Sequence, residues 1–268
     1  HNRRVIEELR EGGAVFVEKL EDIPQGEVCV FSAHGVSKET EQRAGRLGLK
    51  TVDATCPLVT SVHRMVEKYH SQGGDVIIIG HHKHPEVEGT AGRVTDRVHI
   101  VENIVEAAEA ELEAHNNIGY VTQTTLSKAD IDPIVNILTR RFPGIQGPRS
   151  NICFATQNRQ DAVKKLAEFS ELVLVVGSKN SSNSNRLKEV ALSCGVMAHL
   201  IDDSRDINEE WLSGVRRIGI TAGASAPEEL VMGVLRWLGE RNSIEVKELS
   251  GIQENVHFRS AISIEGNP

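Results

Sequence analysis

Short aliphatic runs alternate along the chain with longer segments in which apolar residues recur at helical spacing. The runs are rich in valine and isoleucine, which is typical of strands buried on both faces of a parallel sheet. They lie at residues 28–31, 76–79, 118–121, 172–176 and 218–221. Apolar positions repeat every three or four residues in the segments 58–69, 163–169, 187–194 and 230–238, which predicts amphipathic helices. The alternation predicts an α/β fold with small, mostly parallel sheets.

Each predicted strand is followed by a loop of small or polar residues. The five loops read SAHGVS, GHHKHPEVEG, TQTTLS, GSKNSSNSN and TAGASAPE. Ligands bind open parallel sheets beyond the carboxyl ends of the strands. Five loops of this composition therefore predict one shared polar site.

The chain also contains an internal repeat, in which a cysteine is followed by a helix, a strand, a polar loop, a helix, a strand and a second polar loop. One copy runs from Cys56 to Thr124 and the next from Cys153 to Ser225. Only part of a copy precedes Cys56. We therefore predict three pseudo-equivalent α/β domains around a central cavity, at residues 1–55, 56–149 and 150–242, with a C-terminal tail at 243–268.

Composition and charge limit the classes of function that the chain can have. The 268 residues carry a net charge of −8 without a basic stripe, which argues against a nucleic-acid partner. The apolar runs are too short to span a bilayer, and HNRRVIEELR does not resemble a signal peptide. Four cysteines do not suggest a disulfide scaffold, so we expect a reducing cytoplasm.

Two of the four cysteines occupy equivalent places in the repeat. Cys56 and Cys153 each precede a predicted helix, whose N-terminus favours the thiolate that a metal needs. With a third thiolate they would suit an iron–sulfur site, whereas a structural zinc ion would need a fourth ligand. Burial as small hydrophobic side chains is the alternative. Cys29 and Cys194 fall in apolar patterns, and we expect both in the core.

Histidines and small polar residues from equivalent loops predict an anion site. Histidine donates hydrogen bonds, and helix N-termini add backbone N–H groups. Helix capping by Ser184 and Ser225 is an alternative that is compatible with anion binding. His81, His82 and His84 suggest a metal site less strongly, because Lys83 stands between them and their spacing is not the usual i, i+4. The candidate donors are His1, His34, His84, Ser181, Ser182, Asn183 and Ser225.

A carboxyl group stands next to one of these histidines. Glu86 follows His84 by two residues and could deliver a proton if burial raises its pKa. An exposed surface glutamate is the alternative. Thr124 could orient the carboxyl group, or it could simply precede an N-cap at Ser127, with Asp130 completing a capping box.

Taken together, these motifs resemble the 4-hydroxy-3-methylbut-2-enyl diphosphate reductases, the iron–sulfur enzymes that end the non-mevalonate route to isoprenoids. The resemblance covers residues 1 to about 256 in matching order and spacing. It rests on HNRRVIEELREGGAVFVE, FSAHGVS, DATCPLV, GHHKHPEVEGT, TQTTLS, ICFATQNRQ, VVGSKNSSNSNRL and TAGASAPEELV.

The resemblance implies an activity, a cofactor and roles for single residues. The family reduces (E)-4-hydroxy-3-methylbut-2-enyl diphosphate to isopentenyl and dimethylallyl diphosphate, with electrons from a donor such as flavodoxin or ferredoxin. Cys56 and Cys153 match two of three cysteine ligands of a [4Fe–4S] cluster. Glu86 matches the proton donor, and Thr124 matches its partner near the substrate hydroxyl. His1, His34, His84, Ser181, Ser182, Asn183 and Ser225 match the diphosphate-binding residues.

One departure from the family pattern concerns the cluster. Cys56 precedes His84 by 28 residues, and the same spacing before His1 lies outside the chain. We therefore expect the polypeptide as given to be impaired, and to gain iron and sulfide when the preceding residues are restored. Two rival functions remain: another open-iron enzyme, such as a hydro-lyase or a quinolinate-synthase-like enzyme, or a non-catalytic module that binds phosphate ligands.

Overall fold

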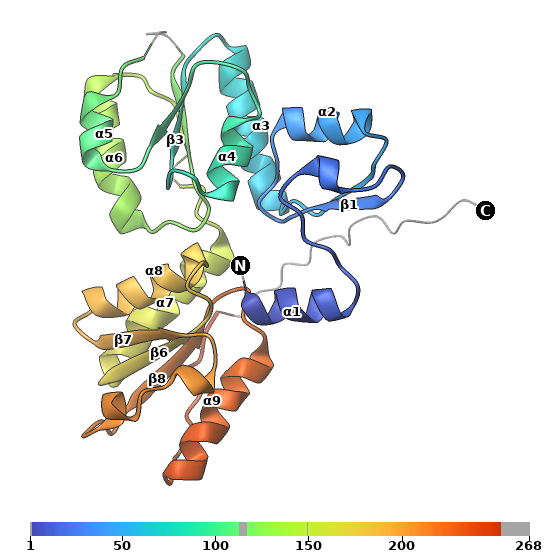
Figure 1. Ribbon diagram of the computed structural model, residues 1–268. Coiled ribbons are helices and arrows are strands. Elements are labelled where there is room, and N and C mark those ends of the chain that lie inside the picture. The colour runs from blue at the N-terminus through green and yellow to red at the C-terminus, as the bar shows by residue number, and fades with distance from the viewer. Residues whose placement is uncertain (1, 113–116, 149, 253–268) are drawn as a thin grey trace. The chain divides into compact units, whose positions relative to one another are not determined.

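The computed structural model describes residues 2–112, 117–148 and 150–252. They fall into two compact units, and we take each by itself (Figure 1). The first unit spans residues 17–152, and the second joins the N-terminal residues up to Phe16 to the segment that starts at Cys153.

The first unit contains two parallel sheets. In the smaller, β1 (Val28–Phe31) pairs with β2 (Lys50–Asp53). In the larger, β3 (Val76–Ile79) lies between β4 (Val98–Val101) and β5 (Gly119–Thr122). The helices are η1 (Leu20–Asp22), α2 (Lys38–Arg46), α3 (Pro57–Ser71), α4 (Pro85–Ala91), α5 (Ile104–Glu109) and α6 (Lys128–Arg141).

Strand β3 shows why a continuous apolar run is needed in the middle of this sheet. Ile77 and Ile79 pack into the cluster that contains Ile131 and Leu138 of α6. Val76 and Ile78 point to the opposite face, toward residues of α3 such as Val66. Both faces are thus covered by helices (Figure 1). Full burial of each such side chain contributes about 1.5–3 kcal/mol.

The second unit repeats this arrangement. Strand β6 (Leu172–Val176) lies between β7 (Met197–Ile201) and β8 (Ile218–Ala222), all parallel. Leu172, Leu174 and Val176 pack toward one face, while Val173 and Val175 pack toward the other. The helices are α1 (Arg3–Glu11), α7 (Phe154–Phe169), α8 (Ser182–Ser193), η2 (Ser204–Asp206), η3 (Glu209–Leu212) and α9 (Glu228–Arg241).

The predicted α/β class with small parallel sheets is confirmed, but three strands escape the sequence pattern. These are β2, β4 and β7, each at an edge of its sheet. Lys50, His99 and His199 interrupt their apolar character, and the three strands are only partly buried. These polar and exposed positions break the continuous valine and isoleucine run that β3 and β6 show, whereas β5, which also lies at a sheet edge, is fully buried and keeps its apolar run.

Two local predictions are wrong for reasons of helix geometry. Cys194 is exposed, because α8 ends at Ser193 and Gly195 then adopts a φ of +81°, which turns the chain away from the apolar face. The cap of α8 is Ser181 rather than Ser184, and the cap of α9 is Pro227 rather than Ser225. Cys29 is buried, as predicted. Among the described helices, none is both long and apolar enough to cross a membrane.

Candidate functional site

Glu86 and Thr124 form a buried pair at the carboxyl ends of β3 and β5. The side chain of Glu86 is 4% exposed, and that of Thr124 is 5% exposed. Thr124 donates its backbone N–H to Glu86 Oε1 at 2.7 Å and its hydroxyl to Oε2 at 2.9 Å. Burial raises the pKa of Glu86, and the two hydrogen bonds from Thr124 oppose this shift. The pair therefore combines a carboxyl group of raised pKa with a hydroxyl that orients it.

The turn before α4 sets the direction of both His84 and Glu86. His84 is the N-cap residue, and its Nδ1 accepts the backbone N–H of Glu86 at 3.2 Å. Pro85 occupies the first helical position, where its missing N–H costs nothing. Lys83 adopts a φ of +61°, so the chain reverses tightly before the cap. Because Nδ1 accepts, the neutral ring carries its proton on Nε2.

His34 lies in the loop after β1, beside His84. The ring centroids are 5.8 Å apart and the rings meet edge to face at 77°. Burial lowers the pKa of His34 from 6.5 to about 4, and the nearby His84 ring adds to this effect. Burial likewise lowers the pKa of His84 to about 4. Both rings are neutral at pH 7, so they offer hydrogen bonds rather than positive charge.

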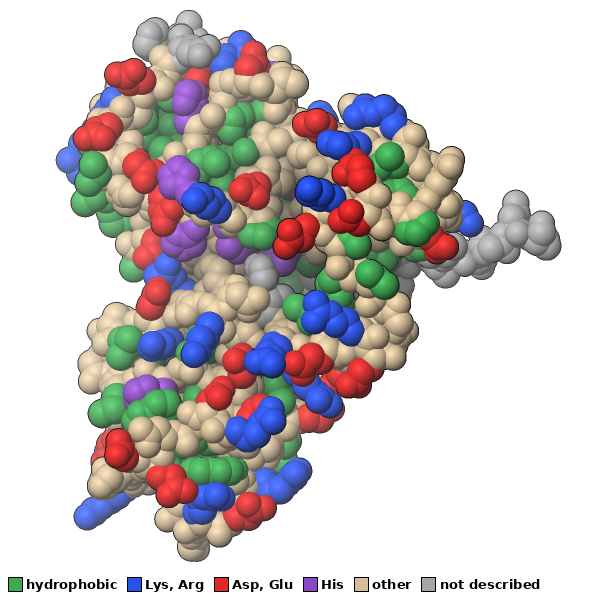
Figure 2. Space-filling model, in the orientation of Figure 1, with side chains coloured by type: hydrophobic (Ala, Val, Ile, Leu, Met, Phe, Trp, Pro, Cys, Tyr) green, Lys and Arg blue, Asp and Glu red, His purple; other side chains and the backbone are tan. Residues whose placement is uncertain are grey.

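Figure 2 shows several histidine side chains on the visible face of the unit that contains β3. Two histidines of the HHKH turn are held by carboxylates from the neighbouring β4–α5 segment. His81 Nδ1 lies 3.1 Å from Glu102 Oε1, and His82 Nε2 lies 2.9 Å from Glu106 Oε2. These contacts assign His81 and His82 to holding the turn, and they leave His84 as the histidine of this turn that faces His34.

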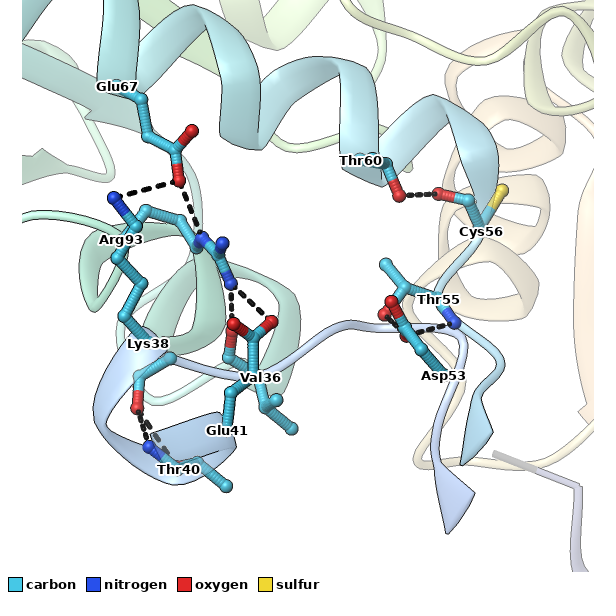
Figure 3. Close-up of polar contacts among 11 residues, drawn as sticks. Val36, Lys38, Thr40, Glu41, Asp53, Thr55, Cys56, Thr60, Glu67 and Arg93 are labelled. Atoms are coloured by element: carbon cyan, nitrogen blue, oxygen red, sulfur yellow. Dashed lines mark hydrogen bonds and ion pairs between the residues drawn. The ribbon is translucent and has the colours of Figure 1, made fainter. Parts of the chain in front are cut away.

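Cys56 stands at the N-cap of α3 and belongs to the same unit (Figure 3). Its backbone N–H donates to the carbonyl of Ala33 at 3.0 Å, which ties its loop to the loop of His34. Just before it, Thr55 donates its hydroxyl and its N–H to Asp53. The thiol is free and partly exposed. The thiol thus stands at the N-terminus of a 15-residue helix.

Cys153 holds the equivalent position in the second unit, at the N-cap of α7. Its Sγ accepts the backbone N–H of Thr156 at 3.2 Å and lies 2.9 Å from the Thr156 hydroxyl. This thiol is also free and partly exposed. The sequence prediction that both cysteines begin helices is therefore confirmed.

The loop between β6 and α8 gathers small polar side chains. Ser181 caps α8, and its hydroxyl oxygen accepts bonds from the backbone and the side chain of Ser184. Asn183 is only 6% exposed, yet within the described residues neither atom of its amide group has a hydrogen-bond partner. An unpaired buried amide costs about 1–3 kcal/mol, so this group is available to bind a polar partner such as a ligand or a water molecule. Ser182 is partly exposed at the first helical turn.

Two predicted donors, Ser225 and His1, are not among these buried or partly buried side chains of the β6–α8 loop. Ser225 is exposed in the turn before α9, in the same unit as Ser181. His1 lies outside the described residues. At the opening of α1, Arg3 donates its backbone N–H to the Ser178 hydroxyl at 3.2 Å, so the start of the chain contacts the β6–α8 loop.

Sequence reasoning missed two residues that shape the Glu86–Thr124 site. Gln123, which is 2% exposed, accepts the backbone N–H of His81 through Oε1 at 3.0 Å. Asn151 and Thr122 exchange two hydrogen bonds, at 2.9 and 3.1 Å, which fix the end of β5. Gln123 stands inside the TQTTLS motif, but Asn151 shows no sequence signal. The alternative given for Thr124, that it precedes a helix cap at Ser127, also holds, because Ser127 caps α6 and forms a capping box with Asp130.

The two cysteines fit a cluster by their chemistry. Both are free thiols at helix N-termini, and thiolates are the ligands that iron–sulfur clusters use. Among the described residues, no group of three or more His, Cys, Asp or Glu side chains is gathered closely enough to hold a metal ion. Cys56 and Cys153 lie at the N-caps of separate helices, α3 and α7.

Comparison with known proteins shows which family the chain belongs to. The family model described as LytB protein matches residues 1–239. A 4-hydroxy-3-methylbut-2-enyl diphosphate reductase of Desulfotalea psychrophila is 61% identical over 99% of this chain and 85% of its own length.

Two solved structures carry the same fold. The E-1-hydroxy-2-methyl-but-2-enyl-4-diphosphate reductase of Plasmodium falciparum superposes with a TM-score of 0.86 at 38% identity, over 89% of this chain and 75% of that one. An (E)-4-hydroxy-3-methyl-but-2-enyl diphosphate reductase, the terminal enzyme of the non-mevalonate pathway, gives 0.62 at 31% identity, over 90% and 85%. These relatives do not favour a hydro-lyase, a quinolinate-synthase-like enzyme or a non-catalytic module. The chain belongs to the LytB family of 4-hydroxy-3-methylbut-2-enyl diphosphate reductases.

Proposed function

We propose that this protein reduces (E)-4-hydroxy-3-methylbut-2-enyl diphosphate to isopentenyl diphosphate and dimethylallyl diphosphate. The reaction breaks one carbon–oxygen bond, consumes two electrons and two protons, and releases water. The observation that carries the proposal is the buried Glu86 carboxyl group, held by two hydrogen bonds from Thr124, in a chain of this family.

Cys56 and Cys153 are the residues that we assign to a [4Fe–4S] cluster. When bound, the cluster would supply the electrons one at a time and a Lewis-acidic iron for the substrate oxygen. The protein contributes two cysteines at helix N-termini and loops that fix their backbone, as at Ala33 for Cys56.

Neutral donors would bind the diphosphate. His34 and His84 are uncharged at pH 7 because burial depresses the pKa of each ring, so they bind the anion through N–H groups. The α8 loop adds hydroxyl and amide donors at a helix N-terminus, where the helix dipole favours an anion. The unpartnered amide of Asn183 supports this role most directly. The full set is His1, His34, His84, Ser181, Ser182, Asn183 and Ser225.

Glu86 would deliver the proton that turns the substrate hydroxyl into a leaving water molecule. Burial raises the pKa of its carboxyl group, which keeps the acid protonated closer to neutral pH. The Thr124 hydroxyl lies 2.9 Å from Oε2 and can orient the acid or relay the proton. The second proton goes to either end of the allylic system, which accounts for two products.

The proposal includes a domain scheme. We assign residues 1–55, 56–149 and 150–242 to three related α/β domains, followed by a tail at 243–268. Support comes from the matching strand orders β4-β3-β5 and β7-β6-β8, each preceded by a helix that a cysteine caps. A cytoplasmic location and an electron donor such as flavodoxin or ferredoxin complete the scheme. The four free thiols suit such a reducing compartment.

An anaerobic turnover assay tests this function. The protein with iron and sulfide restored is given a low-potential reductant and (E)-4-hydroxy-3-methylbut-2-enyl diphosphate, and both isoprenoid diphosphates are expected as products. Consumption of a polycarboxylate instead would indicate a hydro-lyase. A cluster-loaded protein that binds the diphosphate but forms neither product would overturn the proposal.

A further inference from the structure

The C-terminal end of α4 is packed against the loop that carries His34, at two points where only glycine fits. A Cβ added to Gly89 would lie 2.9 Å from the carbonyl oxygen of Gly35. A Cβ added to Gly92 would lie 2.3 Å from the Cβ of Ser37. The carbonyl of Gly92 also accepts the backbone N–H of Lys38 at 3.0 Å. The first turn of the same helix carries His84 and Glu86, so the helix connects this contact to the candidate site.

Arg93, which follows α4, adds hydrogen bonds and ion pairs to this contact. Its Nη1 donates to the backbone carbonyl of Val36 at 3.3 Å, two residues from His34. The same Nη1 pairs with Glu41 of α2 at 2.6 Å, and Nε pairs with Glu67 of α3 at 3.1 Å. Figure 3 shows the guanidinium group between these partners, with Lys38 reaching Glu67 alongside at 3.2 Å. The Arg93 side chain is 13% exposed, so these bonds are partly shielded from water.

We propose that Arg93 is a positioning residue, which holds the loop of His34 against α4 so that His34 and His84 face the same ligand. One guanidinium group bonds the His34 loop and two helices, α2 and α3. Helix α3 also carries Cys56 at its N-cap, and Cys56 donates its N–H to Ala33 in the His34 loop. Arg93, which follows α4, thus joins three segments that carry candidate residues: the His34 loop, α3 and α4. Charge alone is not sufficient, because a planar fork is needed to reach a carbonyl and two carboxylates together.

The inference rests on the proposed function for its kinetic consequence, but its structural consequence can be measured separately. Arg93→Met keeps an unbranched apolar side chain in place of the Arg93 methylene groups and removes the charge and the donors. Arg43→Met is the matched control, because Arg43 of α2 forms an exposed ion pair with Glu21 at the same 2.6 Å. Arg93→Lys keeps the charge without the fork, and it serves as a second test if Arg93→Met folds poorly.

Hydrogen–deuterium exchange in residues 32–37 and steady-state kinetics with the allylic diphosphate give the two readouts. Arg93→Met is expected to exchange these amides faster and to raise KM about 10-fold or more, with a smaller change in kcat. Arg93→Lys should fall between Arg93→Met and the wild type, and Arg43→Met should match the wild type.

Unchanged exchange in both Arg93 variants would overturn the inference, whether or not the protein reduces the diphosphate. Faster exchange with an unchanged KM would also overturn it, because the loop would then move without affecting the ligand. If Arg93→Met speeds exchange in residues 32–37 but the wild-type protein never turns over the diphosphate, only the proposed function is contradicted.

Discussion

At the scale of single residues, burial sets the protonation of the groups assigned to the reaction, and it acts in opposite directions on acid and base. Desolvation raises the pKa of Glu86 and lowers the pKa of His34 and His84. These shifts favour the protonated form of the acid and the neutral form of the two rings. Charged lysines would bind the diphosphate too, but they would lower the pKa of Glu86 and make it a poorer proton donor.

The depressed histidine pKa values predict how stability depends on pH. Each ring has an ordinary pKa of 6.5 when unfolded and about 4 when folded, so the unfolded chain binds more protons between these values. The contribution of the two neutral rings is present above pH 6.5 and is lost as the pH falls toward 4. Thermal unfolding of the wild type should therefore move to lower temperature across this range.

The doubly substituted protein His34→Asn/His84→Asn should lose less stability over the same range, because it lacks both titrating rings. His70→Asn is the control, since this partly buried histidine lies on the far end of α3. Equal pH dependence in the wild type and the double variant would show that the two rings titrate normally.

Much of the candidate site could be predicted at this scale, because its residues stand in loops directly after apolar runs. The link between Glu86 and Thr124 was one of two interpretations, and the structure places the two side chains in contact. Arg93 could not be predicted. Its partners Glu41 and Glu67 lie 52 and 26 residues away, and an arginine with distant acidic partners has no local pattern.

At the scale of elements, the second unit shows how closely a helix must approach the strand ends to present its polar loop. Ser184 of α8 is fully buried, between the loops that follow β6 and β8. A Cβ added to Gly223 would lie 2.1 Å from the Ser184 hydroxyl and 3.3 Å from its Cβ. The glycine therefore allows the first turn of α8, with Ser181 and Asn183, to sit against β8.

Gly223→Ala is expected to destabilise the protein by about 1–3 kcal/mol, because the added methyl group overpacks this contact. Urea unfolding measures the change. Adding Ser184→Ala should recover part of the loss, since it removes the oxygen at 2.1 Å. Gly233→Ala is the control, because a Cβ there meets no atom within 4 Å. Equal stability of Gly223→Ala and the wild type would mean that α8 can shift freely.

The strands with continuous apolar runs could be predicted at this scale, and the more polar strands β2, β4 and β7 could not. Strands β1, β3 and β6 have the predicted bounds, and β5 differs by one residue. Strand β2 (Lys50–Asp53) is largely exposed, and its conformation depends on hydrogen bonds to β1 rather than on its own apolar pattern. Pairing with a distant neighbour leaves no periodic signal in a strand of four residues.

At the scale of the whole molecule, the repeat places one thiol at the N-cap of α3 and one at the N-cap of α7. The account predicts that both bind iron. Cys56→Ser and Cys153→Ser should each lower the iron and sulfide content after anaerobic reconstitution, and weaken the broad absorption at about 400 nm. Cys194→Ser, at an exposed helix end, should change neither. Wild-type iron and sulfide in either site variant would remove that cysteine from the cluster.

The most direct test of the account is the kcat of Glu86→Gln with (E)-4-hydroxy-3-methylbut-2-enyl diphosphate, measured anaerobically beside Glu88→Gln. Glu88 lies on the same helix but is exposed, so it controls for the loss of one carboxylate. The account predicts that Glu86→Gln retains the wild-type KM and loses about 100-fold to 10,000-fold in kcat, while Glu88→Gln behaves as the wild type. A Glu86→Gln protein with undiminished kcat would contradict it.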